Sequence, residues 1–194
     1  RDESIKKDSN YIIYASSYDR GLAYMLKWGW PKIKAECPNA YLKVFYGWNT
    51  FDKMNDLTNP DIKLYKEVLL QLLAQDGVEE CGRIPNSELM KEKAKASIHY
   101  YVGAFQEIDC ITVRESASVG CIPIVSEEGK VFAEKSYCVK ILGNPNIKKT
   151  QEDAADYIID LLKNPKKAEK VRKECKVPDS ERWENVAEEW LKLF

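Results

Sequence analysis

The sequence contains very little histidine and no cysteine arrangement of the kind that binds metal. His99 is the only histidine in 194 residues, and no C-x-x-C pair occurs among the six cysteines, at positions 37, 81, 110, 121, 138 and 175. A zinc site made of histidine and cysteine is therefore not expected. Several cysteines lie in apolar, strand-like surroundings, where a free thiol behaves as a small hydrophobic group. This pattern favours a reducing, cytoplasmic location, although the sequence alone leaves disulfide pairing open.

Long apolar runs and an excess of charge of one sign are also missing. No run approaches the roughly 18 residues of a membrane span, and 30 Lys and Arg nearly balance 31 Asp and Glu, giving a net charge of −1. We therefore expect no membrane span in this chain and no nucleic-acid partner. The chain begins at Arg1 with neither a methionine nor a signal-like segment, so we expect a fragment of a longer protein.

The composition is that of a folded domain. Hydrophobic residues make up 44% of the chain and charged residues 31%, which excludes a disordered chain. Its length is sufficient for one well-packed domain. No internal repeat and no low-complexity linker divides it, so we treat it as one unit.

Strands and helices are predicted in alternation. Short apolar runs predict strands at 11–15, 41–47, 78–84, 98–102, 122–125 and 137–142. Apolar residues spaced by three and four predict helices at 22–33, 61–75, 85–96, 109–119 and 150–163, one from Asn164, and one from Asp179 or Ser180. Gly29 and Pro31 predict a kink near Trp30 in the first helix. Residues 48–60 are predicted to form a loop.

This order of elements predicts an α/β fold. We expect a single Rossmann-like, three-layer domain with a parallel sheet of about six strands and helices on both faces. Residues 1–178 are assigned to this domain, and residues 179–194 to a C-terminal helix that packs on it or reaches toward another domain. Ligands bind such sheets outside the carboxyl ends of the strands. The segments expected to line that crevice are 16–21, 47–48, 83–84, 103–109 and 126–129.

The segment 104–126 organises the rest of the chain. Asp109 is predicted to cap a helix that runs to Val119, and Gly120 to end it. The N-terminus of a helix binds anions, because its free N–H groups and its dipole favour negative charge. Glu115, farther along the helix, could reach the hydroxyls of a sugar attached to that anion, and Glu107 lies just before the helix.

These residues resemble a known sequence motif. Glu107 and Glu115, followed by Gly120 and the apolar strand 121–125 with its proline, are similar to the E-x7-E region of retaining glycosyltransferases of the GT-B fold, particularly family 4. The resemblance implies the C-terminal, donor-binding half of an enzyme that transfers a hexose from a nucleoside diphosphate sugar to an acceptor hydroxyl. The N-terminal, acceptor-binding domain of the same protein would then lie outside this chain.

The resemblance also implies the roles of individual residues. The positions that match the family's nucleotide-sugar site are Arg20, Gly21, Arg83, Ile84, Glu107 and Glu115. Arg20 would grip the diphosphate, Arg83 and Ile84 would lie beside the base, Glu107 would contact the transferred sugar as the catalytic residue, and Glu115 would accept hydrogen bonds from the ribose. No D-x-D pair is present, so we expect a site without metal or cofactor, in which arginine and helix dipoles stabilise the leaving group.

The sequence also departs from the family pattern. Ile108, Asp109 and Cys110 stand where the family often has glycines, and a second basic residue is missing near Ala15. Either Lys95 or Lys130 could supply the missing charge, and Ile122 is inserted ahead of the proline of the following strand. Two alternatives therefore stay open: a non-catalytic, nucleotide-binding Rossmann module, and the related half-domain of a nucleotide-sugar epimerase or phosphorylase.

Overall fold

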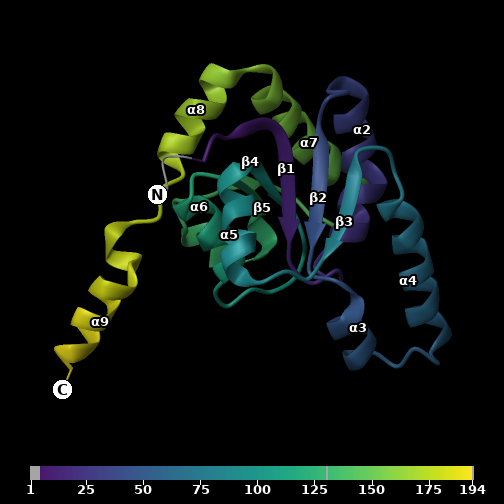
Figure 1. Ribbon diagram of the computed structural model, residues 1–194, viewed down its shortest axis with the longest axis horizontal. Helices are drawn as coiled ribbons and strands as arrows, with labels where there is room; N and C mark the ends of the chain where they lie inside the picture. Colours follow the sequence, from purple (N-terminus) through teal and green to yellow (C-terminus); the bar gives the residue numbers. More distant parts are fainter. Residues whose placement is uncertain (1–4, 130, 194) are drawn as a thin grey trace.

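Six parallel strands form one sheet in the computed structural model, which describes residues 5–129 and 131–193 (Figure 1). The strands are β1 (Asp8–Ala15), β2 (Tyr41–Phe45), β3 (Val78–Gly82), β4 (Ala96–Tyr101), β5 (Ile122–Ser126) and β6 (Val139–Ile141). Their spatial order is β3-β2-β1-β4-β5-β6. The predicted α/β fold with six parallel strands is therefore confirmed.

The strand order places the ligand crevice. β1 lies at the centre, with Ile12 opposite Leu42 of β2 on one side and Ile98 of β4 on the other. Successive strands are added outward from β1 toward β3, and the chain then returns to add β4 on the other side of β1. In open α/β sheets, ligands bind where the order reverses in this way, outside the carboxyl ends of the strands. The crevice is thus expected between the ends of β1 and β4.

Helices cover both faces of the sheet (Figure 1). They are α1 (Leu22–Tyr24), α2 (Trp30–Glu36), α3 (Trp48–Met54), α4 (Pro60–Leu73), α5 (Asn86–Lys95), α6 (Ile111–Ser118), α7 (Lys148–Lys163), α8 (Pro165–Glu174) and α9 (Trp183–Leu191). The larger hydrophobic core includes Ile33 of α2, Leu69 of α4 and Ile158 of α7. A smaller cluster, with Ile13 and Phe45, lies beneath Leu89 of α5 on the other face.

The predicted kink in the first helix is present as a π-helical turn. Residues Met25–Gly29 form this turn between α1 and α2, and Pro31 occupies the first turn of α2. The helical run continues through this turn, since the Trp30 amide donates to the Met25 carbonyl, and Pro31, which has no N–H, interrupts the hydrogen bonding next to it. The kink thus lies next to Trp30, as the sequence predicts.

One helix differs from the prediction. The sequence predicts a loop over residues 48–60, but Trp48–Met54 form α3. The Trp48 ring packs edge-on against Tyr18 and Phe51, with ring centroids 4.8 and 5.5 Å apart, and Phe51 is buried. The sequence signal is only one pair of aromatic residues three positions apart among polar neighbours. Tertiary packing therefore decides the helix, rather than a periodic apolar face.

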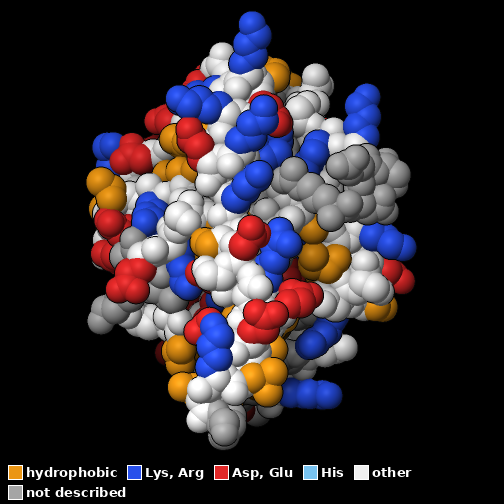
Figure 2. Space-filling model, turned by 90° about the vertical axis from the view of Figure 1, so that its left-hand side faces the viewer, with side chains coloured by type: hydrophobic (Ala, Val, Ile, Leu, Met, Phe, Trp, Pro, Cys, Tyr) orange, Lys and Arg blue, Asp and Glu red, His pale blue; other side chains and the backbone are white. Residues whose placement is uncertain are grey.

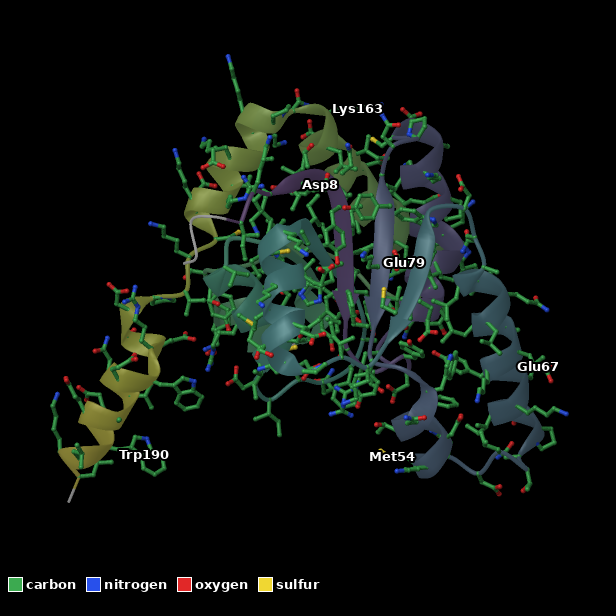
Figure 3. The ribbon with its side chains drawn as sticks, in the orientation of Figure 1. Asp8, Met54, Glu67, Glu79, Lys163 and Trp190 are labelled. Atoms are coloured by element: carbon green, nitrogen blue, oxygen red, sulfur yellow. The ribbon has the colours of Figure 1, made fainter. Side chains whose placement is uncertain are left out.

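The chain ends in a segment that stands apart from the sheet. A short 3-10 turn, Asp179–Glu181, precedes α9, which has no buried residue and carries Trp190 away from the domain (Figure 3). On the side of the molecule that carries α8 and α9, acidic and basic side chains alternate, with hydrophobic ones between them (Figure 2). Among the described residues, no helix is long and apolar enough to cross a membrane.

All six cysteines lie in described parts of the chain, and none forms a disulfide. Burial raises the pKa of Cys121 to about 12, so its thiol stays protonated and packs as an apolar group. Together with the buried strands around it, this agrees with the role that the sequence assigns to the cysteines.

Candidate functional site

Two loops meet at the point where the strand order reverses. One follows β1 and includes Arg20 and Gly21, and the other follows β4 from Val102. Gly21 has a φ of +92°, and a Cβ there would lie 2.7 Å from the Cα of Gly103. A side chain at Gly103 would in turn overlap the carbonyl oxygen of Arg20. The two glycines therefore let the loops touch, and Gly21 contributes backbone shape rather than a side chain.

Arg20 and Glu107, two predicted site residues, are in direct contact. An Nη1 hydrogen of Arg20 is donated to Oε1 of Glu107 at 3.1 Å, although the residues are 87 positions apart in sequence. The guanidinium also stacks on the ring of Phe105, with Cζ 3.0 Å from its centroid. The Arg20 side chain is 24% exposed, and its guanidinium is held between the Glu107 carboxylate and the Phe105 ring.

Tyr101 holds the other side of the Glu107 carboxylate. Its hydroxyl donates a hydrogen bond to Oε1 of Glu107. Burial raises the pKa of Tyr101 well above its ordinary value, and the Glu107 carboxylate adds to the effect. The hydroxyl therefore remains a donor at neutral pH. Glu107 is thus an oriented carboxylate between a cation and a hydroxyl, at the edge of the crevice.

The helix after this loop begins without a side-chain cap. Cys110 occupies the N-cap position of α6 and makes no capping hydrogen bond, so the prediction that Asp109 caps the helix is wrong. Asp109 instead pairs with Arg114 at 2.9 Å. A charged partner one turn away attracts the carboxylate more strongly than a neutral amide does. Within the first turn of α6 the amide of Val113 donates to the Cys110 carbonyl, so the amides of Ile111 and Thr112 are the ones without an intrahelical acceptor. The pairing with Arg114 compensates the charge of Asp109.

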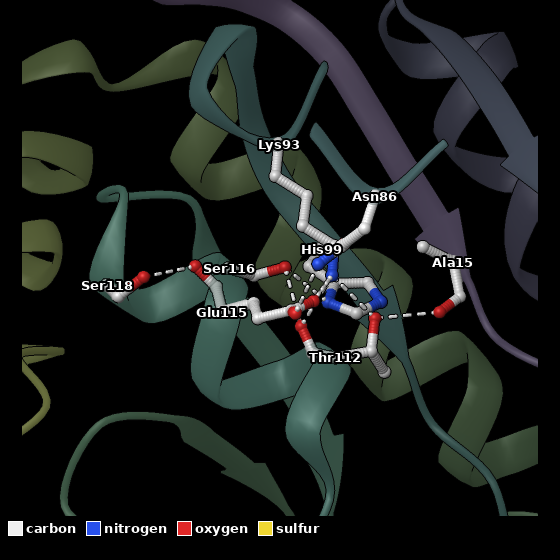
Figure 4. A network of polar contacts seen from close by, with 8 residues as sticks. All are labelled: Ala15, Asn86, Lys93, His99, Thr112, Glu115, Ser116 and Ser118. Atoms are coloured by element: carbon white, nitrogen blue, oxygen red, sulfur yellow. Dashed lines mark hydrogen bonds and ion pairs between the residues drawn. The ribbon is translucent and has the colours of Figure 1, made fainter. Parts of the chain in front are cut away.

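Glu115 lies one turn before the end of α6, in a network of polar contacts (Figure 4). Its Oε2 accepts a hydrogen bond from Nζ of Lys93 at 2.6 Å, and Nδ2 of Asn86 lies 3.5 Å from its Oε1. Lys93 also donates to Oγ1 and to the carbonyl of Thr112, at 2.8 and 3.2 Å. Burial lowers the pKa of Lys93, and the Glu115 carboxylate opposes that shift. Glu115 is thus an ion-pair partner with one oxygen less occupied.

His99 lies behind this network. Its Nδ1 is 2.9 Å from Oγ of Ser116, and its Nε2 has no partner among the described residues. Burial, with the nearby charge of Lys93, lowers the pKa of His99 well below its ordinary value. The ring is therefore neutral and structural.

Arg83 and Ile84 lie two strands away from Arg20, at the end of β3. Arg83 is exposed, and its nearest polar side-chain contact is Oγ1 of Thr50 at 3.4 Å. Ile84 packs against the smaller hydrophobic cluster. The structure does not bring these two side chains to the Arg20–Glu107 pair. Asn86, two residues farther on, does reach toward Glu115.

Of the two lysines considered as a second phosphate ligand, Lys95 lies in a described part of the chain, away from the crevice. Lys95 precedes the first residue of β4, so it lies at the amino ends of the strands, and it pairs with Glu92 at 2.8 Å. A role for Lys95 in this crevice is therefore wrong. Lys130 lies outside the described residues. In the part of the chain that the structure describes, no group of three His, Cys, Asp or Glu side chains could hold a metal ion.

Two residues of the site, Lys93 and Tyr101, were missed from the sequence, whereas Phe105 lies in the segment 103–109 that was expected to line the crevice but had no role assigned to it. Lys93 carries a usable signal, since it lies four positions after Leu89 on the face of α5 that packs toward the sheet. A lysine on an apolar helix face needs a buried partner. Tyr101 and Phe105 have no such signal, because aromatic residues are common in cores and at rims.

Comparison with known proteins gives matches of structure but not of sequence. No family model matches the chain, and no curated protein matches it. The crystal structure of the GtfA/B complex matches with a TM-score of 0.69 and 15% identity, over 97% of this chain and 36% of that one. HepE from Anabaena, in complex with UDP and glucose, matches with a TM-score of 0.66 and 13% identity, over 95% and 48%.

A third match is an α,α-trehalose 6-phosphate synthase from Burkholderia multivorans, with a TM-score of 0.63 and 14% identity, over 89% of this chain and 38% of that one. The chain thus spans less than half the length of each of these three proteins. At such low identity, the matches establish the architecture. This chain has the Rossmann-like fold of one half of a GT-B glycosyltransferase.

Proposed function

We propose that this chain is the donor-binding, C-terminal half of a retaining glycosyltransferase similar to family 4, which transfers a hexose from a nucleoside diphosphate sugar to an acceptor hydroxyl. The observation that carries the proposal is the meeting of Arg20, Glu107 and the uncapped N-terminus of α6 at the crevice. A guanidinium and free helix amides bind a diphosphate, and a carboxylate held beside them is placed for the attached sugar.

Each site residue has a proposed role. Arg20 and the first amides of α6 stabilise the negative charge that develops on the leaving diphosphate, so the reaction needs no metal. Glu107, oriented by Tyr101, contacts the transferred sugar. Glu115 accepts hydrogen bonds from the ribose through the oxygen that Lys93 leaves less occupied. Arg83 and Ile84 are proposed to lie beside the nucleotide base, which their backbone groups contact.

The acceptor is proposed to bind to a second domain of the same protein. Support comes from the matched structures, which are two to three times longer than the part this chain matches. Fixing an acceptor hydroxyl against the sugar requires a second surface, because misplacement by about 1 Å can cost roughly a hundredfold in rate. The exposed apolar side of α9 is the surface we assign to that domain. A cytoplasmic location remains a prediction from the sequence.

A second candidate is a nucleotide-binding module without catalysis. Ile108, which is almost fully exposed, and Asp109 stand where glycines would let backbone amides approach the ligand. Such a module would bind nucleoside diphosphates and nucleotide sugars alike without turnover. The related half-domain of an epimerase or phosphorylase would use the same crevice on a different substrate.

Calorimetry with UDP and uridine tests the proposal, with ADP and GDP as further arms, because HepE is solved with UDP. Arg20→Ala is expected to weaken UDP binding about tenfold or more, since a hydrogen bond to a charged group contributes roughly 1.5–3 kcal/mol. Uridine affinity should stay within about twofold. Arg182→Ala, an exposed arginine paired with Asp179, is the matched control. A wild-type chain that binds none of the diphosphates contradicts the proposal.

A further inference from the structure

Lys93 is a buried ammonium with every proton in use. Its side chain is 0% exposed, and its three N–H groups find three acceptors: Oε2 of Glu115 and the hydroxyl and carbonyl oxygens of Thr112. Figure 4 shows these contacts converging between α5 and α6. Because the ammonium has no exposed surface, it cannot touch a ligand itself. Any role in binding must act through its partners.

Stability alone does not account for a lysine at this position. Replacing a buried ion pair with apolar residues of similar size is often neutral or stabilising, since desolvation of the two charges offsets their attraction. Lys93 is fully desolvated, whereas Glu115 keeps 24% of its side chain exposed. The pair thus has a buried end, the ammonium of Lys93, and a partly exposed end, the carboxylate of Glu115.

Lys93 also joins Glu115 to the strand that carries the diphosphate loop. Thr112, which accepts from Lys93, donates its own hydroxyl to the carbonyl oxygen of Ala15 at 2.7 Å. Ala15 is the last residue of β1, and Arg20 follows five positions later. The contacts therefore run from the end of β1 through Thr112 and Lys93 to Glu115. This chain of contacts fixes the position of the carboxylate relative to the loop of Arg20.

We infer that Lys93 is the positioning residue of Glu115: it holds Oε2 so that Oε1 faces a vicinal diol of the ligand, the ribose of a nucleoside diphosphate. The inference rests on the proposed function. A carboxylate fixed in advance loses little conformational entropy when the diol binds, whereas a free glutamate would have to be ordered by the ligand. The effect of Lys93 on binding is therefore expected to require the ribose hydroxyls.

The test compares UDP with 2′,3′-dideoxyuridine 5′-diphosphate, which keeps the base and the diphosphate but lacks the diol. Lys93→Met keeps the length of the side chain and removes the charge. We expect this variant to bind UDP about tenfold more weakly and the dideoxy compound within about twofold of wild type. Lys95→Met, two residues along the same helix and 51% exposed, should change neither affinity.

The double variant Lys93→Met/Glu115→Gln has no unpaired buried charge, and it keeps the test valid if the single variant fails to fold. It should bind UDP as Glu115→Gln does, because without the carboxylate Lys93 has nothing to position. Equal losses for UDP and the dideoxy compound in Lys93→Met, or a further loss in the double variant, would overturn the inference. So would a wild-type chain that binds both compounds equally, although the proposed function would then stand. A wild-type chain that binds neither contradicts both proposals.

Discussion

At the scale of single residues, the Glu115 carboxylate contacts two side chains, those of Lys93 and Asn86. Glu115 neutralises the ammonium of Lys93 and keeps an oxygen near Asn86. The two ends of the pair differ in solvent access, because Lys93 is buried and Glu115 is partly exposed. Removing one partner is therefore not equivalent to removing the other.

Glu115→Ala should lower the free energy of unfolding by about 3 kcal/mol, since it leaves a buried ammonium without its counter-ion. From the sequence alone, this substitution would be expected to leave stability nearly unchanged. Urea unfolding measures the difference. Adding Lys93→Met should restore most of the loss, whereas Glu174→Ala, an exposed residue of α8, should change the free energy by less than about 0.5 kcal/mol. A Glu115→Ala variant as stable as wild type would show that the ion pair between Lys93 and Glu115 does not form.

His99 makes the stability of the protein depend on pH. Burial and the charge of Lys93 lower its pKa in the folded state well below 6.5, while the unfolded chain takes up a proton near that pH. Stability is therefore complete above 6.5 and declines as the pH falls through the window below it. The expected loss is about 1.4 kcal/mol between about pH 7.5 and about pH 5.5.

Urea unfolding of wild type and His99→Gln at both pH values checks this expectation. The variant lacks the titrating ring but can still hydrogen-bond to Ser116, so its free energy of unfolding should change less over the same window. Carboxylates titrate mainly at lower pH and contribute equally to both proteins. An identical pH dependence in the two proteins would show that His99 is not buried in neutral form.

At the scale of elements, the π-helical turn brings the first helix against the sheet. Gly29 closes this turn with a φ of −83°, so its backbone is not strained. A Cβ at this position would overlap the hydroxyl of Tyr100, which is buried in β4 and bonded to Gln151 of α7. Gly29 therefore sets the approach of the helix to β4.

Gly29→Ala provides a test in which two effects have opposite signs. Helix propensity predicts a gain of about 1 kcal/mol, because alanine replaces glycine inside a helix. Overpacking against Tyr100 predicts a loss of about 1–3 kcal/mol, and we expect the loss to dominate. Thermal and urea unfolding decide the sign.

Tyr100→Phe removes the overlapping oxygen, so Gly29→Ala should cost less in that background than in wild type. A stabilised Gly29→Ala single variant would show that the helix does not approach β4 this closely.

At the scale of the whole molecule, α9 contributes contact surface but no core. Trp183 and Trp190 are 75% and 64% exposed, and no residue of this helix is buried. The anchor of the C-terminal segment lies just before it, where Glu181 pairs with Arg114 at 3.3 Å and with Lys135 at 3.0 Å. The helix can therefore bind another domain without disturbing the sheet.

Deleting residues 183–194 should change the free energy of unfolding by less than about 0.5 kcal/mol and should reduce self-association of the isolated chain. A deletion from residue 179, which also removes Glu181, should cost about 1 kcal/mol more, because Lys135 and Arg114 each lose an ion pair with Glu181, although Arg114 keeps its pair with Asp109. Urea unfolding and sedimentation give the two readouts. A large loss in the free energy of unfolding after deletion of residues 183–194 would mean that α9 packs on the domain.

The sequence by itself determined the class of fold and the order of the elements. Alternating apolar runs and helical periods reflect local conformational preferences and burial, which need no knowledge of distant partners. For the same reason Gly120, with a φ of +75°, could be recognised as the end of α6. The E-x7-E pattern predicted Glu107 and Glu115 as site residues, and the family resemblance added Arg20.

Only the tertiary structure decided which of these side chains meet. The contact between Arg20 and Glu107 joins residues 87 positions apart, and Lys93 reaches Glu115 across 22. Asp109 pairs with the cation of Arg114 and does not cap its helix. Which charged side chains pair depends on their distances and burial in the packed structure, because distance and burial set the strength of a charge pair. A local pattern in the sequence gives neither the distance between two charges nor their burial.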